Sequence, residues 1–274
     1  MLEDKETVMQ RVPPKWNAED YAKNSSAQLQ WGQELISKLA LQGCESVLDI
    51  GCGDGKISAQ LALAVKNGKV LGIDLSEDMI RFASTQFPAA KYPNLSFQCM
   101  DAASIQLSDK FDIAFSSAAL HWVKNHLAIL RGVHTCLKVG GKILFQMGGR
   151  GNVAEIFHTI KKIIQQPRWK SYYEDFTSPY HFYGPEKYEQ WLLESRFCPV
   201  RVELVPKDMQ HYGIDSFRGW LRTTWFPYTD QLPTELRNTF LTEVIEAYMI
   251  THPLNVFGNI HVKVARLEVE AYTL

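Results

Sequence analysis

The run VLDIGCGDG at residues 47–55 constrains the fold of this chain more than any other feature. Its apolar first half is typical of a buried strand, and glycine at every second position afterwards predicts a tight turn into a helix. Glycine adopts positive φ and lacks the Cβ that keeps a ligand away from the backbone. The run therefore indicates either a ligand held close to the main chain or an ordinary strand–helix turn.

Apolar runs alternate with helical periodicities on both sides of this turn. Further strands are expected at 70–74, 95–101, 111–117 and 141–147, and helices at 28–41, 56–66, 76–87 and 126–137. Such alternation predicts a parallel sheet with helices on both faces, so residues 28–147 are expected to form a doubly wound core.

The rest of the chain has a different character. Residues 1–27, with Pro13 and Pro14, are expected to form an N-terminal arm. Residues 148–274 combine expected helices at 153–197 and 214–251 with strands at 201–213 and 261–273, and they are rich in aromatic side chains. We predict an α/β fold with a doubly wound, mostly parallel seven-stranded sheet and an inserted helical cap.

Three aspartates lie at the ends of three successive expected strands, and together they describe a ligand. Asp49 precedes the glycine turn, where a carboxylate suits an ammonium group and repels a pyrophosphate. Asp74 ends the next strand, where an acidic residue accepts hydrogen bonds from ribose hydroxyls. Asp101, followed by Ala102 and Ala103, leaves room for a flat base with an exocyclic amine. Each could also be a helix cap, but as a set they predict S-adenosylmethionine, and the G-x-G-x-G spacing disfavours a dinucleotide.

The run VLDIGCGDG…GIDLSEDMI…CMDA…FDIAFSSAALHW…LKVGGKILFQ resembles the class I S-adenosylmethionine-dependent methyltransferases. The resemblance implies that Gly51 and Gly53 lie against the methionine part and that Asp49 lies near its amine. It further implies cofactor contacts from Asp74 to the ribose, from Leu75 and Met79 to the faces of the adenine, from Asp101 and Ala102 to its edge, and from the backbone at Ser116 and Ser117 to the amino-acid end.

A narrower resemblance lies outside the core. YAKNSSAQLQ, ALHWVKNHLAIL and PRWKSYYEDFTSPYHFYGPEKYEQWLLESRF are similar to the group of trans-aconitate and juvenile hormone acid methyltransferases. That group methylates carboxylates of small molecules. The resemblance implies that Gln28 contacts cofactor or substrate and that Trp122 lines the transfer site.

His121 and Trp122 are the catalytic candidates. Methyl transfer is an in-line displacement that needs alignment and exclusion of water, and an ionised carboxylate needs no base. His121 is therefore expected to be a substrate hydrogen-bond donor, a base, or a structural histidine. Trp122 is expected to be a wall of the transfer cavity or part of the core.

Arg222, in RGWLRTTWF, is the expected anchor for a substrate carboxylate, because a guanidinium pairs with both oxygens. Its rivals are Arg218, Arg150 and His181. Tyr180 and Trp225 are expected to belong to an aromatic lid over the substrate, although most of the cap's aromatic residues serve its core.

Composition excludes several partners. A net charge of −1 without a basic cluster disfavours nucleic acid and anionic membranes, and no apolar run is long enough to span a bilayer. The five cysteines are scattered without a CxxC pair, so we expect reduced thiols, a cytoplasmic protein and no metal. The sequence predicts a small-molecule methyltransferase, most simply an O-methyltransferase of a carboxylate. N- or C-methylation and a cofactor-binding regulatory protein without catalysis stay as alternatives.

Overall fold

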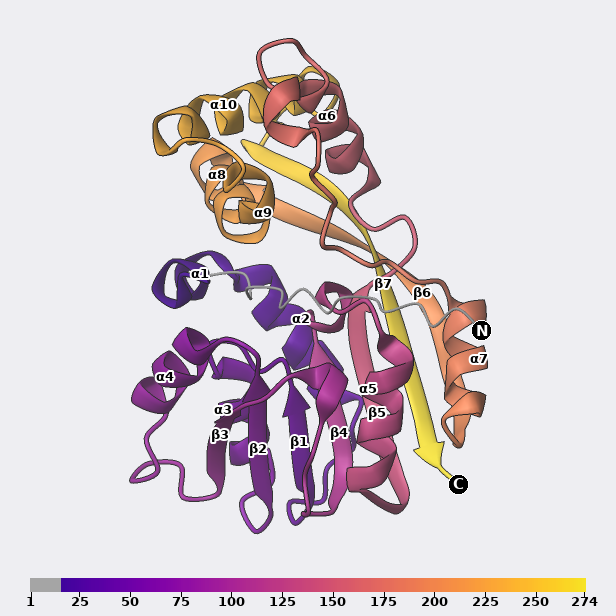
Figure 1. The fold of residues 1–274 in the computed structure, drawn as a ribbon. Coiled ribbons are helices and arrows are strands. Elements are labelled where there is room, and N and C mark those ends of the chain that lie inside the picture. Colours follow the sequence, from indigo (N-terminus) through magenta and orange to yellow (C-terminus); the bar gives the residue numbers. More distant parts are fainter. Residues whose placement is uncertain (1–15) are drawn as a thin grey trace.

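A seven-stranded sheet forms the centre of the computed structural model, which describes residues 16–274 and so leaves residues 1–15 of the expected arm outside it. The strand order is β3-β2-β1-β4-β5-β7-β6 (Figure 1). This confirms the predicted doubly wound architecture. The strands are β1 (Ser46–Ile50), β2 (Lys69–Asp74), β3 (Leu95–Cys99), β4 (Phe111–Ser117), β5 (Leu137–Gly148), β6 (Phe197–Tyr212) and β7 (Asn259–Thr273).

The first five strands run parallel, and the last two depart from this direction. β1 pairs in parallel with β2 and β4, β3 joins β2, and β5 joins β4. β7 pairs antiparallel with both β5 and β6. The chain reverses its direction of winding at β1, so the carboxyl ends of β1 and β4 flank the crevice where ligands bind in open sheets.

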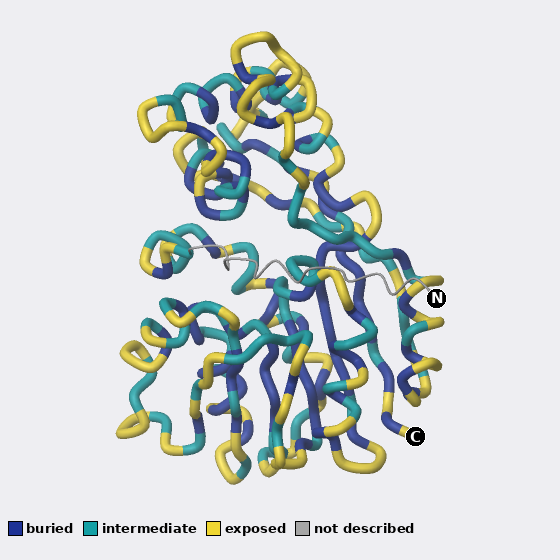
Figure 2. The backbone as a smooth tube through the Cα atoms, viewed as in Figure 1, coloured by how far each residue is buried: buried dark blue, intermediate teal, exposed yellow. Residues whose placement is uncertain are grey.

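Helices cover both faces of the sheet. α2 (Ser26–Ser37) and α3 (Lys56–Ala64) pack on one face through an apolar cluster that includes Leu35, Leu61 and Phe115. α5 (His126–Cys136) and α7 (Pro185–Glu194) pack on the other face through a cluster that includes Ile129, Leu192 and Phe145. α4 (Glu77–Gln86) begins at Ser76, whose hydroxyl accepts from Met79 N, and packs beside β2 and β3. The strands between these layers are the most buried part of the core (Figure 2).

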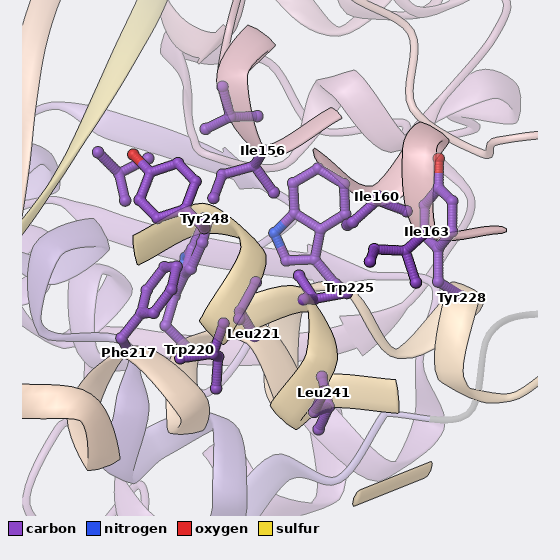
Figure 3. Close-up of a cluster of buried hydrophobic side chains, with 14 of the residues drawn as sticks. Ile156, Ile160, Ile163, Phe217, Trp220, Leu221, Trp225, Tyr228, Leu241 and Tyr248 are labelled. Atoms are coloured by element: carbon purple, nitrogen blue, oxygen red, sulfur yellow. The ribbon is translucent and has the colours of Figure 1, made fainter. Parts of the chain in front are cut away.

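A third apolar cluster forms the cap beyond the carboxyl ends of the strands. β6 and β7 remain paired well past the sheet and carry the cap on their far ends (Figure 1). The cap helices are α6 (Ala154–Ile164), α8 (Gly213–Thr224), α9 (Phe226–Thr229) and α10 (Thr234–Thr251). Their core contains Ile156, Phe217, Trp220, Trp225 and Tyr248 (Figure 3). α1 (Ala18–Asn24) lies between core and cap and contacts both α4 and α8.

Several expected elements differ in extent. β3 ends at Cys99 rather than at Asp101, because the Asp101 carboxylate accepts from Ala103 N and starts a short 3₁₀ helix. Residues 165–184 contain only a 3₁₀ turn at Lys170–Tyr173, and α7 packs on the sheet rather than in the cap. β6 begins before the expected position 201 and tolerates Pro199 and Pro206 because it is an edge strand. None of the described helices is long and apolar enough to cross a membrane.

The buried carboxylate of Glu268 links β7 by hydrogen bonds to β5, to β6 and to the end of α2. Glu268 has no exposed surface and accepts hydrogen bonds from Lys38 Nζ (2.6 Å), Gln146 Nε2 (2.9 Å) and Arg201 Nη1 (2.6 Å). Burial raises the pKa of Glu268, but the donors from Lys38, Arg201 and Gln146 outweigh it, so the pKa lies below its ordinary value. The interaction therefore stabilises the fold at neutral pH and is lost as pH falls through that lowered pKa.

We expect Glu268→Ala to lower the free energy of unfolding by about 3 kcal/mol, because the buried Gln146 and the partly exposed Arg201 and Lys38 lose their shared acceptor. Glu203→Ala is the matched control: Glu203 accepts from the same Arg201 but its side chain is 53% exposed. Its removal should cost less than about 1 kcal/mol. Denaturant unfolding at pH 7 measures both, and equal losses would contradict the assignment of Glu268 as the central acceptor.

Candidate active site

The glycine turn after β1 has no room for a side chain. Gly51 has φ +73°, and a Cβ at this position would come 2.1 Å from the Cβ of Ala119. The amides of Gly51 and Cys52 both donate to the carbonyl of Ile73, at 2.7 and 3.0 Å. The turn is thereby fixed against the end of β2, and its backbone borders a cavity.

This first cavity opens at the carboxyl ends of β1, β2 and β4. Ten of the eleven residues that the sequence assigned to the cofactor line it: Gln28, Asp49, Gly51, Gly53, Asp74, Leu75, Met79, Asp101, Ala102 and Ser117. The eleventh, Ser116, is absent from the lining, because it is fully buried and its hydroxyl donates to the carbonyl of Ile50. The sequence did not single out Trp16 and Tyr21 from the N-terminal segment, which line it as well. Aromatic residues before a core are common, so their spacing gave no signal.

Asp49 is buried at the base of this cavity, with 2% of its surface exposed. The Ser58 hydroxyl donates to its Oδ2 at 2.6 Å. Burial raises the pKa of Asp49 to about 7, against the opposing hydrogen bond from Ser58. A carboxylate that is costly to ionise in the free protein gains most from a cationic ligand group beside it.

Asp74 and Asp101 are held by backbone amides. Asp74 accepts from Gly53 N at 3.0 Å and from Ser76 N at 2.9 Å, and burial raises its pKa. Asp101 accepts from Ala103 N at 2.8 Å. A carboxylate has about four acceptor positions, so both retain capacity for ligand hydroxyl or amine groups.

The polar atoms of the first cavity suit a cation better than a phosphate. Its only described cationic side chain is Lys56, which lies 3.0 Å from Asp54 Oδ2. Two buried atoms, Gln28 Oε1 and Ser117 Oγ, have no hydrogen-bond partner among the described residues. Buried polar atoms without a partner are costly, so the cavity wall is completed by a ligand with polar groups.

A second cavity adjoins the first and lies under the cap. The two share Trp16, Tyr21, Gln28, Ala118 and Trp122. Ala118 has φ +59°, a left-handed conformation that is strained for a residue with a side chain and is found at functional sites. The other walls of the second cavity are mainly aromatic and apolar and include Trp31, Val153, Tyr180, Phe182, Met209, Trp220, Trp225 and Val264.

Arg266 of β7 is the only cationic or anionic side chain among the described residues that line the second cavity. It is 4% exposed, its Nε and Nη2 have no hydrogen-bond partner in the described chain, and its guanidinium lies 5.1 Å from the Trp31 ring. Burial lowers the pKa of Arg266 to about 10, so it is still cationic at neutral pH. A buried, unpaired guanidinium is costly and is the natural partner of an anionic ligand.

His121 lines the second cavity in a form that donates. The Gly148 amide donates to His121 Nδ1 at 3.4 Å, which places the ring proton on Nε2. Burial and the nearby Arg266 hold the pKa of His121 well below its ordinary value, so the ring is neutral. A neutral ring with its acceptor nitrogen occupied can donate to a ligand but is poorly suited to act as a base.

The structure brings most of the predicted substrate residues together, with one exception. Trp122, Tyr180 and Trp225 line the second cavity, and Trp122 packs on Tyr180 at 4.7 Å. Arg222 lines neither cavity, because its guanidinium is bound by Asp20.

The rival anchors are also elsewhere, since Arg218 donates to Thr242, Arg150 pairs with Glu186, and His181 is absent from both linings. Arg266 was missed by the sequence analysis. The sequence did contain a signal for it: Arg266 follows Val262 and Val264 at every second position of the final strand, so a charged residue shares the face of two apolar ones.

Comparisons with known proteins identify the family of this chain. Residues 47–141 match the model of a family described as a methyltransferase domain. An uncharacterized methyltransferase of Schizosaccharomyces pombe is 31% identical over 212 residues, which cover 74% of this chain and 80% of the relative. The YcgJ protein of Bacillus subtilis, a solved structure, superposes with a TM-score of 0.58 at 19% identity over 90% of this chain and 98% of its own, which shows the fold alone.

Two further relatives carry more specific names. A trans-aconitate 2-methyltransferase of Methylobacterium nodulans is 25% identical over 258 residues, covering 92% of this chain and 96% of the relative. A juvenile hormone acid O-methyltransferase of Bombyx mori is 28% identical over 225 residues, covering 78% and 74%.

Asp49 predicts a pH dependence of the free protein. Because its pKa is raised from 3.8 to about 7, the folded state resists ionisation, and its contribution to stability falls as pH rises from 4 to 7 and is then constant. In Asp49→Asn the Ser58 hydroxyl keeps an acceptor and this loss disappears. We therefore expect the difference in unfolding free energy, Asp49→Asn minus wild type, to increase by on the order of 2–4 kcal/mol from pH 5 to pH 8, because only the wild type loses stability over this range. Parallel pH profiles of unfolding would contradict the assignment.

Proposed function

The chain belongs to the class I S-adenosylmethionine-dependent methyltransferases, and from this premise we propose that it methylates a carboxylate of a small molecule to give a methyl ester. The cofactor is S-adenosylmethionine, and the first cavity is the place for it. The second cavity, which shares walls with the first, is the place for the acceptor.

The observation that carries the choice of acceptor is the charge of the second cavity. Arg266 supplies a buried cation with two unpaired donors, and no carboxylate among the described residues lines that cavity. His121 is neutral and its Nδ1 already accepts from Gly148. An amine or phenol acceptor has to lose a proton to a base, whereas a carboxylate is already ionised. The cavity therefore favours an acid.

Each lining residue has a proposed role that follows from its place in one of the two cavities. When bound, the cofactor supplies an electrophilic methyl group on a positive sulfur, which an ionised carboxylate can take up without proton transfer. Asp49 and Ser117 would hold its amino-acid end, Asp74 its ribose, and Asp101 and Ala102 the edge of its adenine. Arg266 and the Nε2 of His121 would hold the acceptor carboxylate. Trp16, Trp122 and Tyr180 would exclude water from the junction of the cavities.

The opposite charges of the two cavities favour the reactants over the products. The acidic first cavity attracts a cationic cofactor, and Arg266 attracts an anionic acceptor. After transfer the ester lacks the negative charge that Arg266 attracts, so it is held less tightly. The thioether keeps its ammonium group and loses only the positive charge on sulfur. The same arrangement disfavours N-methylation, because Arg266 repels an ammonium substrate.

Two relatives support an acid as the acceptor. Their names state action on trans-aconitate and O-methylation of juvenile hormone acid. The aromatic walls of the second cavity and its single cation suit an acid with one carboxylate at this position and an apolar body.

Turnover of S-adenosylmethionine against a panel of small carboxylic acids tests the proposal, with the amide and the amine of the same carbon skeleton as controls. We expect acids alone to give methylated products, detected as methyl esters by mass spectrometry. Turnover of the amines without that of the acids would contradict the proposed function.

Arg266→Met is expected to separate function from stability. Loss of the guanidinium should lower kcat/KM for an acid by about 10²–10³-fold, the usual consequence of removing one partner of a buried charge pair. The free energy of unfolding should not fall, because an unpaired buried charge is replaced by an apolar side chain. Calorimetric affinity for S-adenosylhomocysteine should stay unchanged. Wild-type kcat/KM in this variant would exclude Arg266 as the anchor.

A further inference from the structure

The guanidinium of Arg222 joins the cap to the N-terminal segment. Its Nε donates to Asp20 Oδ2 at 2.8 Å and its Nη2 to Asp20 Oδ1 at 2.6 Å, a two-point contact between α8 and α1. Paired hydrogen bonds of this kind fix orientation as well as distance. Neither residue lines the first or the second cavity, so we assign the pair no direct contact with a ligand in either one.

The segment that this pair holds borders both cavities. Trp16 and Tyr21 line the first and the second cavity alike. The Trp16 ring lies 5.0 Å from that of Trp122 and 4.9 Å from that of Phe226, so it contacts the transfer site and the cap together. Tyr21 lies in α1 and Trp16 lies two residues before it, so a displacement of α1 would change the walls of both cavities.

α1 is also tied to the core, but by a different kind of contact. Lys56, in the first turn of α3, donates from Nζ to the Ala22 carbonyl at 2.6 Å. On the cap side the approach of α8 is close, since a Cβ on Gly219 would come 2.1 Å from Asn24 Oδ1. α1 thus bridges core and cap, and the Asp20–Arg222 pair is its ionic link to the cap.

We infer that Asp20 and Arg222 form a positioning pair that holds α1 across both cavities, so that one segment encloses cofactor and acceptor and their binding is coupled. Ligands that share one ordering step assist each other reciprocally. The acceptor half of this inference rests on the proposed function. The cofactor half rests only on the first cavity.

The cofactor half is tested with S-adenosylhomocysteine as the probe. Arg222→Ala and Asp20→Ala should each weaken its calorimetric affinity about two- to five-fold, the range of a partly exposed ion pair. Lys23 of α1 is exposed, so trypsin cleavage after Lys23 reports the opening of α1. Cleavage should be faster in both variants and less protected by S-adenosylhomocysteine.

A charge-reversed pair and a matched control separate positioning from general damage. Asp20→Arg combined with Arg222→Asp should restore affinity and protection towards the wild type. Arg218→Ala removes an arginine one turn earlier on α8, whose Nη1 donates to Thr242 and not to α1. It should leave both readouts unchanged, and unfolding temperatures measured in parallel should be similar for all variants.

Kinetics with the best acid from the panel test the acceptor half. KM for S-adenosylmethionine and KM for the acid should rise together in Arg222→Ala, while kcat changes less than two-fold. Wild-type affinity and cleavage in Arg222→Ala, or the same loss in Arg218→Ala, would overturn the inference. Failure of the proposed function would give a different result: no acid would yield an ester, while the effects of the variants on S-adenosylhomocysteine affinity and on trypsin cleavage would still be observed.

Discussion

The acceptor side is constrained above all by the buried guanidinium of Arg266, whose Nε and Nη2 have no hydrogen-bond partner within residues 16–274. Burying an unpaired charge costs several kcal/mol, and the sequence places Arg266 on a strand that cannot turn it outwards. β7 is paired on both sides, with Arg266 opposite Gly148 of β5 and opposite Val205 of β6. Trp31 covers the guanidinium on one side, and Glu268, two residues along the same face of β7, partly offsets its charge. The remaining donors are directed to a cavity that an anion would complete.

On the cofactor side the buried charged groups are carboxylates instead of a guanidinium. Backbone amides hold the Asp74 carboxylate at the end of β2, the Ser58 hydroxyl holds the Asp49 carboxylate in β1, and Gly51 and Gly53 add no side chain between them. An acidic cavity and a basic cavity therefore meet at Gln28, Ala118 and Trp122. The strain at Ala118 lies at this junction. In the proposed function, the cationic methyl donor and the anionic acceptor would meet at this common wall, from which aromatic rings would exclude water.

The lining of the first cavity, which is the proposed cofactor site, could be predicted from sequence because its signals are local. Strand, turn and acidic residue lie within a few positions of each other at Asp49, Asp74 and Asp101, so short patterns are sufficient. The acceptor half depends on contacts between distant segments. Arg222 looked like an anchor beside Trp220 and Trp225, but Asp20, some 200 positions earlier, binds it. Arg266 lies in a strand with an ordinary alternating pattern. Its burial depends on how the cap folds over β7, which the local sequence does not indicate.

Determination of the complex with S-adenosylhomocysteine and the acid that turns over best would test the central claim most directly. The account predicts that the acid's carboxylate accepts hydrogen bonds from Arg266, with one oxygen directed towards the cofactor sulfur across the junction at Trp122. A carboxylate bound elsewhere, with Arg266 unengaged or a different atom directed at the sulfur, would contradict it.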